Sequence, residues 1–159
     1  MPSGVNWTGV SWPSMTSSQL RPALTRPPRL LTSIPGIGPL NATALTAAIG
    51  NAQTFRRGRD LAAWLGLVPK QVTTGGKPKL LGISKRGNGY LRKMLIHGAR
   101  AALSTLSKGE TPLGAWLRGL LGRAHVNTVV VALAAKLARI AWAVIRRGEK
   151  FNMKAATAL

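Results

Sequence analysis

Acidic side chains are almost absent from this chain, and their scarcity limits both the contacts it can form internally and the chemistry it can perform. Its 159 residues include 23 Lys and Arg but only 3 Asp and Glu, which gives a formal net charge of +20. So large a surplus needs a polyanion to neutralise it, and nucleic acids are the commonest polyanions inside cells. Binding to DNA or RNA is therefore the first expectation.

The few acids also exclude several catalytic classes. Asp60, Glu110 and Glu149 are scattered along the chain, whereas a two-metal nuclease site needs several carboxylates in one place. The absence of cysteine excludes a disulfide framework, a zinc ribbon and a thiol nucleophile. We therefore expect no metal site and no cofactor in this chain. The N-terminus lacks a signal-peptide pattern, so the cytoplasm is the expected compartment.

The composition predicts one folded domain with irregular ends. Hydrophobic residues make up 45% of the chain, as in globular proteins and unlike disordered basic tails. Residues 1–32 contain five prolines and no periodic pattern, which predicts a disordered or irregular segment. We place the domain at residues 33–151 and a short tail at 152–159.

Periodic apolar positions predict a mainly α fold, with a helix-hairpin-helix element and a bundle of about four to five helices. Asp60 is expected as the N-cap of the second helix and Asn88 as the N-cap of the third. Between them, the glycine-rich residues 69–87 predict a short hairpin or a mobile flap. The expected helices cover residues 39–49, 61–65, 89–106, 112–121 and 126–147.

The last of these helices raises the question of a membrane span. Residues 126–145 are mostly apolar, but Lys136 and Arg139 lie near their middle. Each basic residue there costs about 2.5 to 3.5 kcal/mol on membrane insertion scales. We interpret the segment as a buried helix of a soluble protein and expect no membrane partner.

The histidines and the helical tryptophans are expected to have structural roles. His97 and His125 have no acidic neighbours and make a poor metal site. Trp64, Trp116 and Trp142 lie at apolar positions of predicted helices, where core packing is commoner than base stacking.

The sharpest short motif is the glycine turn Ile34-Pro35-Gly36-Ile37-Gly38, directly before the first helix. Glycines allow a tight turn and expose backbone N–H groups to a phosphate oxygen beside a helix N-terminus. We therefore predict that Gly36, Ile37 and Gly38 bind DNA. The alternative is an ordinary turn.

A second candidate is the basic, glycine-rich stretch of residues 77–88, which covers the second half of the predicted flap and leads into Arg92 and Lys93. A flexible backbone with Lys and Arg suits phosphate contacts that position a protein without specifying sequence. The alternative is a solvated charged loop, but hardly any acids lie nearby to neutralise these charges. The DNA-binding residues predicted here are Lys77, Lys79, Ser84, Lys85, Arg86, Arg92, Lys93 and Arg100.

Three blocks in this order resemble the C-terminal domain of bacterial insertion-sequence transposases of the one-hundred-and-ten type. The resemblance covers residues 33–151, and residues 98–101 and 131–142 also fit it. The three blocks are Ser33-Ile-Pro-Gly-Ile-Gly38 with Ala44-Leu45, Leu61-Ala-Ala-Trp-Leu-Gly-Leu-Val-Pro69, and Gly82-Ile-Ser-Lys-Arg-Gly-Asn88 with Tyr90-Leu-Arg92.

The resemblance implies DNA strand exchange by a serine that attacks a phosphodiester, beside metal-binding acids of an N-terminal RuvC-like domain. It further implies a bridge-type guide RNA, homo-oligomers or a partner RuvC-like half, and a divalent metal such as Mg²⁺ in that half. The family serine precedes a glycine, and the matching residue here is Thr74, followed by Gly75. Thr keeps the hydroxyl, but its β-methyl stiffens χ1 and crowds an in-line attack. A turn residue without chemistry is the alternative for Thr74.

These observations lead to three hypotheses. The first is the DNA-binding C-terminal part of such a transposase, a truncated copy inactive alone. The second is a stand-alone, non-catalytic helix-hairpin-helix module that binds nucleic acid. The third is a basic structural protein of a ribonucleoprotein particle, for which the motifs would be coincidental.

Overall fold

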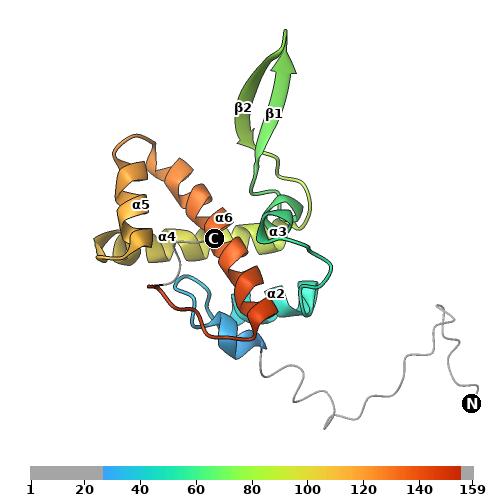
Figure 1. Cartoon of the computed structure of the whole chain (residues 1–159), viewed down its shortest axis with the longest axis vertical. Helices are drawn as coiled ribbons and strands as arrows, with labels where there is room; N and C mark the ends of the chain where they lie inside the picture. The colour runs from blue at the N-terminus through green and yellow to red at the C-terminus, as the bar shows by residue number, and fades with distance from the viewer. Residues whose placement is uncertain (1–26, 155–159) are drawn as a thin grey trace, which may run out of the picture.

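The helix α6 (Val126–Arg147) forms the centre of the fold, and α3, α4 and α5 pack against it (Figure 1). The computed structural model describes residues 27–154. By length and composition alone α6 could cross a membrane, but 56% of its most apolar window is buried inside this fold. Its interior positions are those of a core helix, with Leu133, Leu137 and Ile140 almost fully buried.

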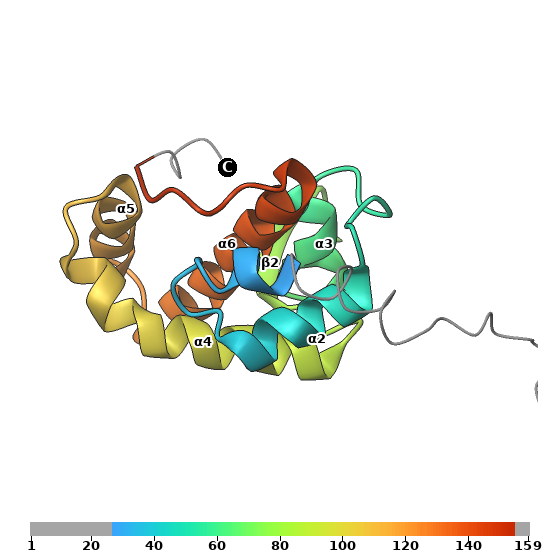
Figure 2. The same ribbon diagram turned by 90° about the horizontal axis from the view of Figure 1, so that it is seen from below.

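The predicted mainly α fold is confirmed. A short helical segment over residues 27–31 leads into five helices and one two-stranded antiparallel sheet. The view from below shows α2 beside α4, and α6 runs obliquely above both in the picture (Figure 2). The remaining elements in chain order are α2 (Pro39–Ile49), α3 (Gly58–Trp64), β1 (Pro69–Thr74), β2 (Lys77–Ile83), α4 (Gly89–Lys108) and α5 (Pro112–Leu121).

Side-chain caps begin α4, α5 and α6. At α6 the Nδ1 of His125 accepts a hydrogen bond from the Asn127 N–H at 3.2 Å. The Asn88 side chain accepts a hydrogen bond from the Leu91 N–H at 3.1 Å, as predicted, and the Thr111 hydroxyl accepts one from the Gly114 N–H at 3.1 Å. Such caps satisfy N–H groups that have no partner within a helix. Gly148 ends α6 in the left-handed conformation, with φ +68°.

The prediction that Asp60 is an N-cap was wrong. Helix α3 begins at Gly58, after Arg57, so Asp60 lies inside the first turn. There its carboxylate accepts a hydrogen bond from the Arg57 N–H at 3.0 Å and complements the helix dipole. The earlier start fits the packing against α6, because a Cβ at Gly58 would lie only 3.1 Å from the Arg139 Cα.

The two ends of the described region meet. Leu31 is fully buried although it precedes position 33, so the folded part includes residues that the sequence pattern left out. The Phe151 N–H donates to the Ser33 hydroxyl oxygen at 2.9 Å. The predictions for residues 1–26 and 155–159 lie outside the described residues.

The predicted flap is a β-hairpin that projects from the helical body (Figure 1). Gly75 and Gly76 form its two-residue turn, with φ of +59° and +75°, the conformation that matches the twist of paired strands. Every residue of β1 is exposed. The hairpin option is thus confirmed.

The tryptophans follow the prediction only in part. Trp142 is partly buried, and its Nε1–H donates to the Phe55 carbonyl at 3.0 Å. Trp116 packs against the core from α5. Trp64, however, is 38% exposed, and its ring packs beside that of Phe55, 5.6 Å between centroids.

The glycine turn packs its backbone against the middle of α4. Gly36 has a φ of +87°, and a Cβ there would lie 2.7 Å from the Gly98 carbonyl oxygen. A Cβ at Gly98 would in turn collide with the Gly36 backbone. Two glycines therefore allow a backbone approach that no other residue pair permits.

This contact predicts opposite effects of two helical Gly→Ala substitutions. We expect Gly98→Ala to lower the free energy of unfolding by about 2 to 3 kcal/mol, because the new methyl group meets rigid backbone. The control Gly119→Ala, with nothing within 4 Å of its Cβ, should raise it by about 0.5 to 1 kcal/mol through helix propensity. Urea denaturation measures both, and equal effects would contradict the packing described.

Candidate nucleic-acid interface

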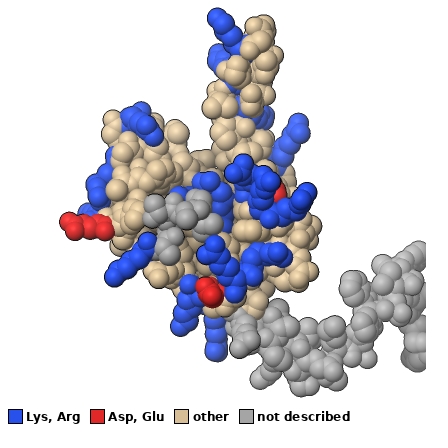
Figure 3. Space-filling view, in the orientation of Figure 1, with Lys and Arg blue, Asp and Glu red and all other residues tan. Residues whose placement is uncertain are grey.

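Most of the predicted DNA-binding residues lie on three segments that follow one another. The hairpin β1–β2 leads into a turn over residues 84–88, and this turn leads into the exposed face of α4. Lysine and arginine side chains on the hairpin and the body are visible in Figure 3. The structure therefore distributes the basic stretch of the sequence over a hairpin, a turn and a helix.

The hairpin carries a hydroxyl and two cations on one face. Thr74 lies directly opposite Lys77, and Val72 lies opposite Lys79. Because directly opposed residues project to the same side of a sheet, the side chains of Thr74, Lys77 and Lys79 share one face. With about 3.3 Å per residue, the strands extend roughly 20 Å from the body. This face can thus bring two ammonium groups to a phosphate beside the Thr74 hydroxyl.

The chemistry around Thr74 is incomplete in the described part of the chain. Lysines can stabilise the negative charge of a phosphoryl transition state, but activation of a hydroxyl also needs a base or a metal. Within residues 27–154 no group of three or more His, Cys, Asp or Glu could hold a metal ion. The carboxylate of Asp60, moreover, already accepts the Arg57 N–H.

The turn over residues 84–88 is held rigidly, in contrast to the flexible loop that we expected. The Ser84 N–H donates to the Val68 carbonyl at 2.8 Å, and the Lys85 N–H donates to the Gly66 carbonyl at 3.1 Å. Lys85 has a φ of +56°, a conformation that a non-glycine residue adopts only when its surroundings impose it. Its side chain and that of Arg86 remain exposed.

Two glycines allow this turn to sit on the end of α3. Gly66 and Gly87 both have positive φ, and a Cβ on Gly66 would collide with the Arg86 backbone, as one on Gly87 would with the Trp64 carbonyl. The backbone of Lys85 and Arg86, from which the exposed cationic side chains extend, therefore has a fixed position relative to α3.

Arg92 stabilises the same turn by hydrogen bonds to backbone carbonyls. One of its terminal guanidinium nitrogens, Nη1, donates to the Leu65 carbonyl at 3.0 Å and to the Arg86 carbonyl at 3.1 Å. This positioning role could not be predicted from the sequence, because the acceptors are backbone atoms. Direct contact of Arg92 with DNA stays a prediction.

The exposed face of α4 extends the basic surface. Lys93, His97 and Arg100 are exposed at i, i+4 and i+7, so they form one stripe about 10 Å long. Tyr90 begins this stripe and is 55% exposed; the sequence analysis did not select it. Arg100 also donates to the Asn127 side chain, at 3.4 Å.

The glycine turn contributes less surface than predicted. Ile37 is 3% exposed and Gly36 packs against α4, whereas Gly38 is exposed at the N-terminus of α2 with open space around it. A phosphate could therefore approach at Gly38 rather than along the whole turn. Phosphate binding at this turn stays a prediction.

Comparison with known proteins gives a consistent result. A family model described as "Transposase IS116/IS110/IS902 family" matches residues 28–111. The chain is 52% identical over 117 residues to a "Probable family 20 transposase" of Pseudomonas aeruginosa, covering 74% of this chain and 35% of that protein.

Two further relatives are transposases of named insertion sequences. The transposase of IS1111A from Coxiella burnetii is 47% identical over 120 residues, covering 76% of this chain and 33% of the relative. The transposase of IS1328 from Yersinia enterocolitica is 47% identical over 124 residues, covering 78% and 37%. The chain thus spans about a third of the length of these relatives.

The two neighbouring cations of α4 should behave differently when substituted. We expect Arg92→Gln to lower the free energy of unfolding by about 1 to 2 kcal/mol, because two carbonyls lose a charged donor. Lys93→Gln, whose side chain is exposed, should stay within about 0.5 kcal/mol of the wild type. Thermal or urea denaturation measures both, and an unaffected Arg92→Gln protein would refute the fastening role.

Proposed function

Because the chain belongs to the IS116/IS110/IS902 family of transposases, we propose that it is the DNA-binding C-terminal part of such an enzyme. One observation carries the proposal: a rigid turn presents Lys85 and Arg86 between a hairpin that carries Lys77 and Lys79 and a basic helix face. Cations fixed in this way can follow a sugar-phosphate backbone without reading bases.

Each predicted segment has a role in this proposal. The α4 stripe and the turn over residues 84–88 hold the duplex, while the hairpin reaches along it with Lys77 and Lys79. Ser84 and Gly38 offer further phosphate contacts at the turn and at the N-terminus of α2. A helix-hairpin-helix element formed by residues 27–31, the glycine turn and α2 agrees with this use.

For strand exchange, the chain depends on a partner. We propose that Thr74 occupies the nucleophile position, that a RuvC-like half of the same or another chain supplies the acids, and that a bridge-type guide RNA selects the DNA. A metal such as Mg²⁺ in that half would neutralise charge on the phosphate. This chain's own contribution is the Thr74 hydroxyl, held opposite the ammonium group of Lys77.

The proposed chemical step balances as a transesterification. The bond from the Thr74 hydroxyl oxygen to phosphorus forms while the bond from phosphorus to the leaving strand oxygen breaks, and the hydroxyl proton passes to a base of the partner half. The β-methyl group of Thr slows this attack relative to Ser. We further propose that these residues are inactive by themselves and work in the cytoplasm, without a membrane partner, as a homo-oligomer or with a RuvC-like half.

A second candidate is a stand-alone module that binds nucleic acid without catalysis. It is favoured by Thr in place of the family serine at position 74. The two candidates share the interface and differ only in the role of Thr74.

Salt dependence of DNA affinity tests the shared interface. For duplex DNA the logarithm of the affinity falls with the logarithm of the salt concentration, with a slope of about −0.9 per phosphate contact. We expect the double variant Lys85→Gln/Arg86→Gln to reduce the magnitude of this slope by about 2. The control Arg147→Gln/Lys150→Gln removes the same charge at the end of α6 and should change the slope by less than half as much. Equal changes would mean that the turn has no special part in binding.

Covalent trapping separates the two candidates. The chain is mixed with a RuvC-like half, guide RNA and donor DNA, and a protein–DNA adduct is sought on denaturing gels. Under the transposase proposal, wild type gives an adduct, Thr74→Ala gives none, and Thr74→Ser gives about tenfold more because the crowding methyl group is gone. If neither wild type nor Thr74→Ser forms an adduct, the binding module is the correct candidate.

A further inference from the structure

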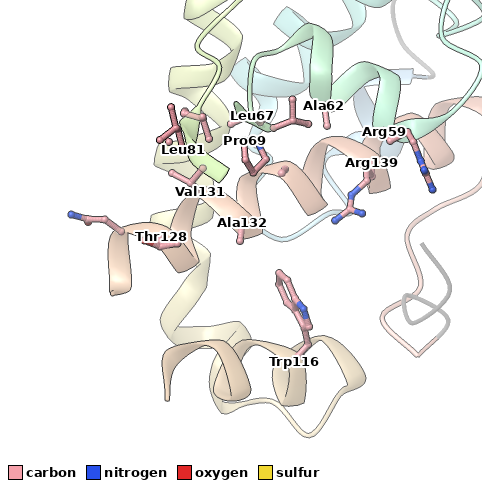
Figure 4. A pocket seen from close by; sticks show the side chains of 15 residues that line it. Arg59, Ala62, Leu67, Pro69, Leu81, Trp116, Thr128, Val131, Ala132 and Arg139 are labelled. Atoms are coloured by element: carbon pink, nitrogen blue, oxygen red, sulfur yellow. The ribbon is translucent and has the colours of Figure 1, made fainter. Parts of the chain in front are cut away.

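A groove of about 610 Å³ runs along α6, between the base of the hairpin and α5 (Figure 4). In Figure 4 the Trp116 side chain extends from α5 toward α6 and forms one wall. Leu67, Pro69 and Leu81, around the base of the hairpin, lie on the other side. The floor is the exposed side of α6, with Thr128, Val131, Ala132, Ala135 and Arg139.

The floor of the groove is a second apolar face of α6. Its residues follow one another at i, i+3, i+4, i+7 and i+11 from Thr128, which is one continuous stripe about 16 Å long. Val131, Ala132 and Ala135 are only half-buried, and Leu81 beside them is 45% exposed. Helix α6 is thus apolar on two sides, and the fold fully covers only one of them.

The charges at the groove are all positive. Arg59 and Arg139 lie at one end (Figure 4) and no acidic residue lines the groove. The Arg139 Nε is buried without a hydrogen-bond partner, although a buried guanidinium group normally has its donors satisfied. The two guanidinium groups at this end of the groove therefore favour a carboxylate over a neutral acceptor.

Lys136 adds to this positive field. Its ammonium group lies 5.2 Å from the centre of the Trp116 ring. Burial and the positive charge of Arg139 lower the pKa of Lys136, and a negative charge nearby would offset both causes.

We propose that this groove docks an amphipathic α-helix of a partner protein, with apolar residues against α6 and Trp116 and a carboxylate at Arg59 and Arg139. Helix-in-groove recognition uses apolar anchors at i, i+3, i+4 and i+7, and the floor is long enough for about three turns of such a helix. This surface is additional to the nucleic-acid interface and does not depend on it.

Charge complementarity favours a separate acidic partner over the other possible occupants. A second copy has only three acids against a net charge of +20, so it is a poor source of a carboxylate for Arg59 and Arg139. Residues 1–26 contain no Asp or Glu and cannot supply a carboxylate side chain. A nucleic-acid strand has the right charge, but its phosphates do not match an apolar floor.

Peptide binding to the full chain tests the proposal. The probes are two fluorescent peptides of about 18 residues, or five helical turns, that share one composition of Leu, Ala, Glu and Gln. One has Leu on a single helical face with Glu at one end, and the other is scrambled. Because both have the same charge, we expect at least tenfold tighter binding of the amphipathic peptide by fluorescence anisotropy.

Matched variants locate the site. Ala132→Glu places a charge on the floor of the groove, and Ala101→Glu makes the same change on the exposed face of α4. We expect Ala132→Glu to weaken binding of the amphipathic peptide at least tenfold and Ala101→Glu less than threefold. Arg59 is exposed, so Arg59→Gln leaves the core intact. We expect this variant to weaken binding of the amphipathic peptide about threefold or more. It tests the site even if Ala132→Glu fails to fold.

Three results would overturn the proposal. The first is equal affinity for the amphipathic and scrambled peptides, and the second is equal effects of Arg59→Gln and the control Arg123→Gln. The third is that Ala132→Glu weakens binding of single-stranded DNA at least as much as Ala101→Glu, which places the same charge on the α4 face of the nucleic-acid interface, because the groove would then belong to that interface. Failure of DNA binding by the Lys85→Gln/Arg86→Gln variant bears only on the proposed function and leaves this test unaffected.

Discussion

The contact between the end of α3 and the turn over residues 84–88 determines where the basic surface of this protein lies. Gly66 and Gly87 allow the two backbones to touch, and Arg92 joins them through two carbonyls. The hairpin enters and leaves beside this contact, and α4 begins directly after it. The directions of the hairpin and of the α4 stripe are therefore both set by one packed junction rather than by flexible loops.

The scarcity of acids leaves the cations beside this junction without internal counter-charges, so the junction decides where these cations meet a polyanion. With 23 basic and 3 acidic residues, the fold cannot neutralise its charge internally, so its stability depends on apolar packing around α6 and on caps such as Asn88. The same shortage leaves the cations of the hairpin and the turn over residues 84–88 available to a polyanion. It also explains why a strand-exchange reaction would need acids from elsewhere, while the exposed apolar groove of α6 offers a place where a partner could attach.

Much of the fold could be predicted because its signals are local. Pro39, Pro112 and the glycines at positions 50 and 148 mark helix ends by their own backbone preferences, and Gly75-Gly76 marks the hairpin turn. Contacts between distant residues gave no such signal. Nothing near Gly36 in the sequence indicates that Gly98 lies against it. The groups that hold Arg92 are backbone carbonyls, which every residue has, so no residue type marks them. Helix α3 begins before Asp60, at a glycine that fits closely against α6.

The most direct measurement of the central claim is lysine footprinting of the full chain. The lysines are acetylated with and without duplex DNA at low salt, and each site is read by mass spectrometry. If a rigid turn organises the charge into an interface, DNA protects Lys77, Lys79, Lys85 and Lys93, while Lys108 and Lys150 react as before. Equal protection of all six lysines, or none, would contradict the account, because the surplus charge would then act as a diffuse field or would not contact DNA.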